Sequence, residues 1–197
     1  MQIGRSKKSE LDGKIDELEY KIQDLKRRVA ELRRKRPKPQ VADYPFTDWN
    51  GEQATLSSLF GDKEHLILIH NMGKDCSYCT MWADGFNGLL PHLQSRAAFV
   101  VTSPDPPEVQ KELALSRGWR FPMYCVGAES GFIADMAFMQ GKSELTPGLS
   151  IFEKQPDGSI LHVARSEFGP GDDYCPVWHL FALLPGGVSD WEPKFSY

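Results

Sequence analysis

Apolar residues in the first forty positions recur with alternating spacings of four and three. They are Leu11, Ile15, Leu18, Ile22, Leu25, Val29 and Leu32. This is a heptad repeat with leucine at d and β-branched residues at a, the combination that favours two parallel strands in a coiled coil. In such a pair Lys14 would attract Glu19 of the second copy, whereas the next two pairs would oppose like charges. The pattern predicts either a homodimer through this helix or an amphipathic helix folded back on its own domain.

A basic, proline-containing segment follows the heptads. The residues 33–36 are all Arg or Lys, and Pro37 and Pro39 come directly after them. Cations suit the C-terminal end of a helix, and prolines stop it and favour an extended linker. We therefore expect residues 1–40 to form a helix and linker and residues 41–197 to form a globular domain. A solvated helix end explains the basic cluster better than a nucleic-acid or membrane partner does.

The rest of the chain alternates between short apolar runs and helical patterns. Continuous apolar runs predict buried strands at 66–70, 97–102 and 121–126, and helical spacing predicts helices at 76–93, 106–117 and 177–184. Turns at Asn50-Gly51 and Asp157-Gly158 predict two hairpins, the second spanning 148–163. This order of elements indicates an α/β sandwich with a mixed central sheet, preceded by the long heptad helix.

Composition narrows the class of protein. The chain has 197 residues, of which 41% are hydrophobic, and four are cysteines, too few for a disulfide-stapled secreted scaffold. No apolar run is long enough to span a bilayer, and the N-terminal sequence lacks the pattern of a secretory signal, so a cytoplasmic location is expected. The net charge of −4 hides +6 in residues 1–40 and −10 in residues 41–197, which supports two parts with different roles.

The sharpest chemical signal is a pair of cysteines, Cys76 and Cys79, where a buried strand gives way to a helix. The first turn of a helix has unpaired N–H groups that stabilise a thiolate, the form that attacks a disulfide. Cys76, nearer the helix start, is the expected nucleophile, and Cys79 is the expected resolving thiol. Asp75 is the expected N-cap, and Lys74 and Asp75 would shift the pKa of Cys76 in opposite directions.

Two other interpretations of this pair remain open. A zinc site would need two further ligands, and the other cysteines and the histidines stand singly in the sequence, so neither a metal nor a cofactor is expected. The cysteines could also be purely structural. Cys125 and Cys175 could join a redox cycle, although a lone cysteine beside a proline at a helix start, as at Cys175, is more often structural.

The globular part resembles a thioredoxin-like family catalogued as domain of unknown function 899. The matching pieces are His70-Asn71-Met72, Cys76-x-x-Cys79-x-x-Trp82-Ala83-Asp84-x-Phe86-Asn87-Gly88, Gly118-Trp119-Arg120-Phe121-Pro122, Pro147-Gly148-Leu149-Ser150-Ile151-Phe152 and Asp190-Trp191-Glu192-Pro193. The resemblance implies a thioredoxin-like fold and a thiol redox role, without an established substrate. The sequence departs from the family in the short approach to Cys76, where a longer insertion is expected.

Further site residues are expected around the dithiol. Pro147 resembles the proline of thioredoxin-fold proteins that follows a cis bond and faces the dithiol, so Thr146 and Pro147 are expected to bind an extended substrate. A trans proline that begins an edge strand is the alternative. Tyr78 precedes the second cysteine as a tyrosine does in glutaredoxins, which makes it a candidate substrate contact. Asp84 is either a proton acceptor for Cys79 or a solvated helix residue.

These observations together predict a thiol–disulfide oxidoreductase acting on a protein or small-molecule disulfide. The alternative from a different class is a non-catalytic redox sensor or interaction module that dimerises through its N-terminal helix. A thiol peroxidase is less favoured, because the Pro-x-x-x-Thr/Ser-x-x-Cys run of peroxiredoxins fits neither Cys76 nor Cys79.

Overall fold

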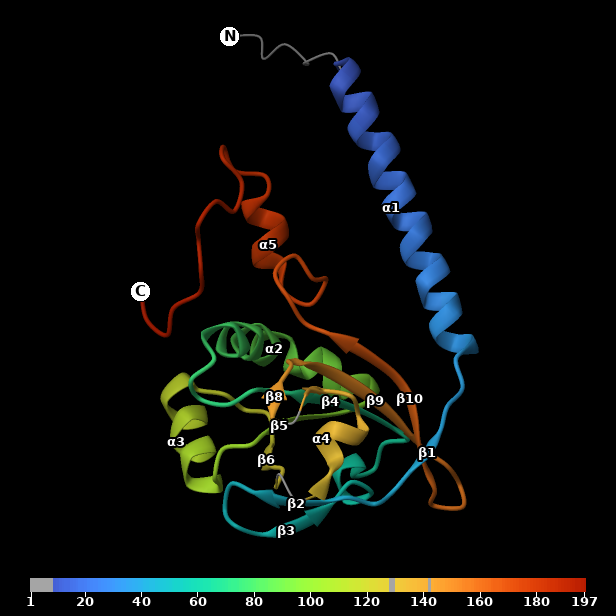
Figure 1. Cartoon of the computed structure of the whole chain (residues 1–197), viewed down its shortest axis with the longest axis vertical. Coiled ribbons are helices and arrows are strands. Elements are labelled where there is room, and N and C mark those ends of the chain that lie inside the picture. The colour runs from blue at the N-terminus through green and yellow to red at the C-terminus, as the bar shows by residue number, and fades with distance from the viewer. Residues whose placement is uncertain (1–8, 128–129, 142) are drawn as a thin grey trace. The chain divides into compact units, whose positions relative to one another are not determined.

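The computed structural model of the chain describes residues 9–127, 130–141 and 143–197. The chain divides into two compact units, Met1–Pro37 and Lys38–Tyr197, which are described separately below (Figure 1). The boundary lies three residues before the one expected from the sequence. The reason is local: Gln40 and Val41 already form strand β1 and pair with Leu161 and Ile160 in the second unit.

The described part of the first unit is the helix α1 (Glu10–Lys35). Ser9 caps its N-terminus in a reciprocal capping box with Asp12, and basic residues occupy its last turn. No residue of α1 is buried, and the seven heptad positions are between 45% and 67% exposed. The predicted helix is confirmed, while its pairing with a second copy stays a prediction.

The second unit, called the body here, is built on an eight-stranded mixed sheet in the order β1-β10-β9-β4-β5-β6-β2-β3. Its strands are β1 (Gln40–Val41), β2 (Pro45–Asp48), β3 (Gln53–Thr55), β4 (His65–His70), β5 (Ala98–Ser103), β6 (Met123–Cys125), β9 (Gly148–Lys154) and β10 (Ile160–Glu167). The neighbours β4, β5 and β6 run parallel, and β9 is antiparallel to β4. The three apolar runs therefore form the centre of the sheet, as the sequence predicts.

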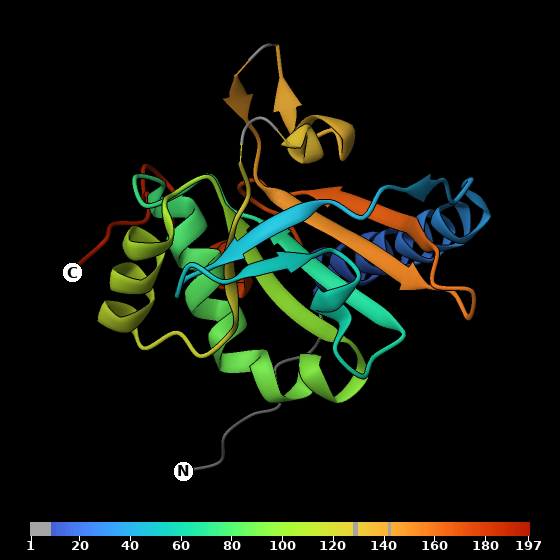
Figure 2. The ribbon, with the colours of Figure 1, turned by 90° about the horizontal axis from the view of Figure 1, so that it is seen from below.

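Helices and shorter elements complete the body. They are η1 (Ser58–Phe60), α2 (Ser77–Arg96), α3 (Pro107–Arg117), α4 (Phe132–Asp135), the paired strands β7 (Met139–Gln140) and β8 (Glu144–Leu145), and α5 (Pro176–Phe181). Figure 2 shows α4 and the β7–β8 pair projecting together from one side of the sheet. The sequence did not predict these three elements, because two to four residues are too few for a periodic pattern. No helix in the described residues is long and apolar enough to cross a membrane.

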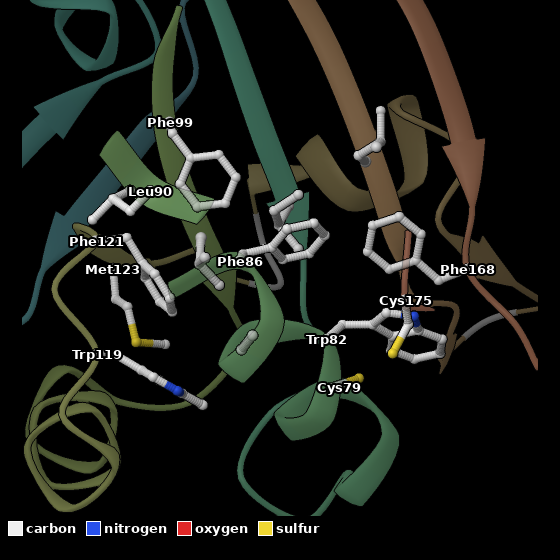
Figure 3. Close-up of a cluster of buried hydrophobic side chains, with 14 of the residues drawn as sticks. Cys79, Trp82, Phe86, Leu90, Phe99, Trp119, Phe121, Met123, Phe168 and Cys175 are labelled. Carbon is white, nitrogen blue, oxygen red and sulfur yellow. The ribbon is translucent and has the colours of Figure 1, made fainter. Parts of the chain in front are cut away.

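Alternate residues of β4 face two different cores. Leu66 and Leu68 pack in a cluster with Phe132 of α4, whereas Ile69 packs in a second cluster with Cys79. The second cluster, called the dithiol core here, joins α2 to the sheet (Figure 3). It also includes Trp178 of α5. The helix that carries the cysteine pair is therefore held against the central strands by buried apolar side chains.

Candidate active site at the start of α2

The cysteine pair lies where strand β4 ends and helix α2 begins. His70 is the last residue of β4, and Cys76 is the N-cap of α2, so five residues connect the strand to the cap. Cys79 lies one turn further along the helix and is only 3% exposed, whereas Cys76 is partly exposed. The structure thus places the two sulfurs at a strand-to-helix junction, as the sequence predicts.

The helix cap itself is not the residue expected from the sequence. The sulfur of Cys76, rather than the carboxylate of Asp75, takes the N-cap position and accepts the backbone N–H of Cys79 at 3.0 Å. The two carboxylate oxygens of Asp75 instead accept hydrogen bonds from Lys74 Nζ, at 2.7 and 2.8 Å. Because Lys74 and Asp75 neutralise each other on the surface, neither is free to set the charge state of Cys76.

The surroundings of Cys76 favour its thiolate. The pKa of Cys76 is lowered to about 7, chiefly because the thiol of Cys79 donates a hydrogen bond to its sulfur. Partial burial opposes this shift, and the backbone N–H groups of Cys79 and Tyr78 add to it. An ordinary cysteine has a pKa of about 8.5, so Cys76 carries far more thiolate at neutral pH.

The surroundings of Cys79 favour its neutral thiol. Its pKa is raised well above the ordinary range, because it donates to the Cys76 sulfur and because it is buried. The backbone N–H of Met72 lies 3.5 Å from its sulfur, a weaker contact that opposes the shift. The two cysteines therefore differ in environment: Cys76 is accessible and its thiolate is favoured, whereas Cys79 is buried and its neutral thiol is favoured.

The loop before Cys76 is fixed by two side chains that sequence reasoning missed. Asn71 Oδ1 accepts the backbone N–H of Gly73 at 2.8 Å, and Asp105 accepts the backbone N–H of Lys74 at 2.7 Å. Gly73 has a φ of +107°, and a Cβ added there would lie 3.0 Å from both oxygens of Asp105. A signal for Asp105 was present, because it follows β5 at the same sheet edge where β4 ends.

Tyr78, which lies between the two cysteines in the sequence, packs against an aromatic side chain of α5. The ring of Tyr78 stacks on Trp178 with centroids 6.1 Å apart and an interplanar angle of 21°. Burial raises the pKa of Tyr78, and the charge of Glu192 raises it further. The predicted substrate contact at Tyr78 is therefore a residue that also joins α2 to α5.

Asp84 is engaged elsewhere than at Cys79. Arg117 of α3 donates to both of its carboxylate oxygens, with Nε 2.9 Å from Oδ1, and the indole of Trp119 donates to Oδ1 at 2.8 Å. The side chain of Asp84 is partly exposed, whereas Cys79 is buried. This placement makes Asp84 a link between α2 and α3, and no contact with Cys79 supports the role of proton acceptor, which was one of the two alternatives for it.

The expected cis bond before Pro147 is wrong. The structure describes both Thr146 and Pro147, and the peptide bond that joins them is trans. Pro147 directly precedes strand β9, and its carbonyl accepts the N–H of Phe168 at 2.9 Å, while the N–H of Thr146 donates to the carbonyl of Phe138 at 3.0 Å. These bonds satisfy the segment without a cis turn. Gly148 pairs with His70, so Pro147 still lies at the sheet edge from which the dithiol loop leaves.

The two remaining cysteines lie in different places. Cys125 is on β6, in register with Thr47 of β2. Cys175 is 3% exposed and belongs to the dithiol core together with Cys79 and Trp82 (Figure 3). Within the described ranges, no group of three or more His, Cys, Asp or Glu side chains is arranged to hold a metal ion.

Solved structures with a similar architecture include peroxiredoxins. Peroxidoxin BcpB from Mycobacterium tuberculosis is 26% identical with a TM-score of 0.52, and the match covers 67% of this chain and 86% of that one. A cysteine mutant of PrxQ from Xylella fastidiosa is 15% identical with a TM-score of 0.56, covering 67% and 85%. These likenesses confirm a thioredoxin-like fold for the body.

The match by sequence is longer than the match by structure. No curated protein matches the chain. A family described as bacterial protein of unknown function (DUF899) matches residues 15–194, which includes most of α1 as well as the body. This span covers the dithiol, its approach loop and the helix α5 that flanks it. The chain therefore belongs to the DUF899 family.

Proposed function

We propose that the body is a thiol–disulfide oxidoreductase in which Cys76 is the nucleophile and Cys79 the resolving thiol. The main support for this proposal is that the N–H and the thiol of Cys79 both donate to the Cys76 sulfur. This arrangement holds a thiolate at the accessible position and keeps the proton on the buried sulfur. The peroxiredoxin neighbours support a redox role of this general kind.

The proposed reaction has two exchange steps. The Cys76 thiolate attacks one sulfur of a substrate disulfide, forming a mixed disulfide and releasing the other substrate sulfur as a thiolate. Loss of the negative charge on Cys76 removes the hydrogen bond that holds the proton on Cys79, so Cys79 ionises more readily. Its thiolate attacks Cys76 and releases the second substrate thiol. The protein ends with a Cys76–Cys79 disulfide, and an external dithiol supplies the two electrons that reduce it.

The proposed substrate is a protein or small-molecule disulfide. Cys76 is partly exposed, and Tyr78 next to it presents a ring that could contact such a substrate. Thr146 and Pro147 remain proposed contacts because they lie at the same sheet edge, although the N–H of Thr146 is already used within the protein. A cytoplasmic location, as expected from the sequence, would supply the reductant.

The mixed disulfide gives a direct test. A Cys79→Ser protein incubated with insulin is expected to stop at a covalent adduct through Cys76, because no resolving thiol is left. The matched control is Cys76→Ser, which keeps Cys79 but lacks the accessible thiolate and should form no adduct. Non-reducing electrophoresis and peptide mass spectrometry identify the linked residue. Absence of an adduct in Cys79→Ser, or equal adducts in both variants, would contradict the proposal.

A thiol peroxidase is the second candidate, because BcpB is named a peroxidoxin and is 26% identical over most of the body. The Cys76 thiolate would attack a peroxide oxygen, giving a sulfenic acid and releasing the alcohol or water. Cys79 would then displace water from that sulfenic acid to form the disulfide. Peroxide consumption by the reduced protein, compared with insulin reduction at the same thiol concentration, decides between the two. Faster oxidation by peroxide than by insulin would favour the peroxidase.

A further inference from the structure

The helix α1 presents an apolar stripe that its own unit does not cover. Its heptad residues are exposed by 45% to 67%, and no residue of the helix is buried. A stripe of seven large apolar side chains repeated at heptad spacing is the pattern by which helices pair. The charged residues beside the stripe indicate which partner, in which orientation, would fit it.

Charge is divided unequally along α1. The first part of the helix, residues 10–20, has five acidic residues and one lysine, a net charge of −4. The second part, residues 21–35, has seven basic and two acidic residues, a net charge of +5. A second copy running in the same direction would place like ends together, whereas a second copy running in the opposite direction would place each acidic end against a basic one.

We propose that α1 pairs with α1 of a second copy in antiparallel orientation, because the division of charge along the helix outweighs the parallel preference of its a and d residue types. The apolar stripe fits this arrangement in one register, in which positions a and d face each other across the pair. Ile22 then packs against the second copy's Leu25, Ile15 against its Leu32, and Leu18 against its Val29. The twofold symmetry repeats each of these layers, so six layers form and only Leu11 in the first turn is left out.

The same register brings opposite charges together along one flank. Asp12 lies beside Arg33 of the second copy and Glu19 beside its Lys26, and symmetry makes four such attractive pairs. A parallel pair would instead have two attractive pairs and would oppose Lys21 to Lys26.

The other flank of the antiparallel pair consists of cations, Lys14, Lys21, Arg28 and Lys35. Lys14 and Lys21 are already paired within their own helix, with Glu10 at 2.7 Å and Glu17 at 2.6 Å. Their repulsion across the pair is therefore reduced.

The antiparallel arrangement also separates the two linkers. In this register Lys35 of one copy lies level with Asp12 of the other, 23 residues away along the helix, so the linkers leave the pair at points about 35 Å apart at 1.5 Å per residue.

One substitution distinguishes the two orientations. Lys26→Glu places two glutamates opposite each other at two symmetry-related contacts of the antiparallel pair. It should raise the dimer Kd about tenfold, which corresponds to about 1.4 kcal/mol over two surface contacts that each change from attraction to repulsion. In a parallel pair the same change would replace the repulsion of Lys21 by an attraction and would lower the Kd. The matched control is Arg27→Glu, which has the same change in charge on the outer face of the helix. The double variant Glu19→Lys/Lys26→Glu restores the antiparallel charges and should restore the Kd.

Sedimentation equilibrium of the full chain measures these constants, and circular dichroism confirms that each variant keeps its helix. Weakening by Lys26→Glu with rescue in the double variant supports the proposal. A wild-type chain that stays monomeric, a dimer unchanged by Lys26→Glu, or a dimer tightened by it would overturn the proposal. None of these results depends on the redox activity of the body.

Discussion

Two helices of the body begin at a cysteine, and only one of these cysteines has the environment of a nucleophile. Cys76 is the N-cap of α2 and Cys175 is the N-cap of α5, both in extended backbone conformation and both in the dithiol core. The pKa of Cys76 is lowered to about 7, whereas burial raises the pKa of Cys175. The same position at a helix start therefore shifts the pKa of a cysteine in opposite directions.

The difference arises from donors and exposure. Cys76 is partly exposed and accepts from the N–H and thiol of Cys79, while Cys175 is buried and only the backbone N–H of Val177 favours its thiolate. Pro176 removes one N–H from the first turn of α5, and the carboxylate of Asp172 adds a charge that disfavours a thiolate. At these two helix starts, the thiolate is favoured at the cysteine whose sulfur receives both a helix N–H and a thiol donor.

The largest expected effect comes from exchanging each cap cysteine for serine. Cys76→Ser should lower the rate of insulin reduction at least about a thousandfold, because the nucleophile is lost. Cys175→Ser replaces a buried, neutral thiol at the equivalent position of α5 and should change the rate less than about threefold. Turnover with an excess of reductant measures both. Comparable losses in the two variants would mean that Cys175 takes part in the redox cycle.

The next effect concerns the donor on Cys79. Cys79→Ala removes the thiol hydrogen bond and should move the pKa of Cys76 up by about one unit, toward the ordinary value of about 8.5. Cys79→Ser keeps a donor in the same place and should move it less. The ultraviolet absorbance of the thiolate, followed against pH, reports the midpoint. Equal midpoints in the alanine and serine variants would show that the side-chain donor is not what lowers the pKa.

A third change tests the loop that connects β4 to Cys76. Gly73→Ala should lower the free energy of unfolding by about 2 kcal/mol, because a positive φ is combined with a Cβ close to Asp105. Gly51→Ala is the matched control, since Gly51 also has a positive φ but nothing within 4 Å of an added Cβ; its cost should be about 1 kcal/mol. Urea denaturation of both variants measures the difference. If the two cost the same, the contact with Asp105 does not restrict the loop.

The smallest effect is expected at Asp84. Asp84→Asn weakens the link to Arg117 and should lower the free energy of unfolding by about 1 kcal/mol, while the pKa of Cys76 and the insulin reduction rate stay unchanged. Thermal unfolding and the thiolate titration measure the two quantities separately. A tenfold loss of activity without a loss of stability would return Asp84 to the role of proton acceptor.

Local sequence patterns were sufficient for most of the fold. The continuous runs that became β4 and β5 and the Asp157-Gly158 turn between β9 and β10 are signals contained within a few neighbouring residues. The position of Cys76 and Cys79 between a strand and a helix is equally local. These features depend on periodicity and turn chemistry, which a single sequence displays directly.

The sequence did not anticipate hydrogen bonds between segments that are distant in the chain, or an unusual capping residue. Asp84 is engaged by Arg117, which is thirty-three residues away, and no local pattern indicates that contact. Asp105 was missed because it accepts the backbone N–H of Lys74, which lies in the loop after the neighbouring strand β4. The N-cap was misplaced by one residue because the Cys76 sulfur accepts the capping bond, a role that serine, threonine, aspartate and asparagine usually perform.

The pH dependence of Cys76 alkylation in the reduced wild-type protein tests most directly whether Cys76 is the nucleophile. Only the thiolate reacts, so the rate of iodoacetamide labelling should be constant above the pKa and fall tenfold for each pH unit below it. Mass spectrometry assigns the label to Cys76 or to another cysteine. A midpoint near pH 7 with labelling confined to Cys76 is the predicted result. A midpoint near the ordinary value of about 8.5, or faster labelling of Cys79 than of Cys76, would contradict the assignment of Cys76 as the nucleophile.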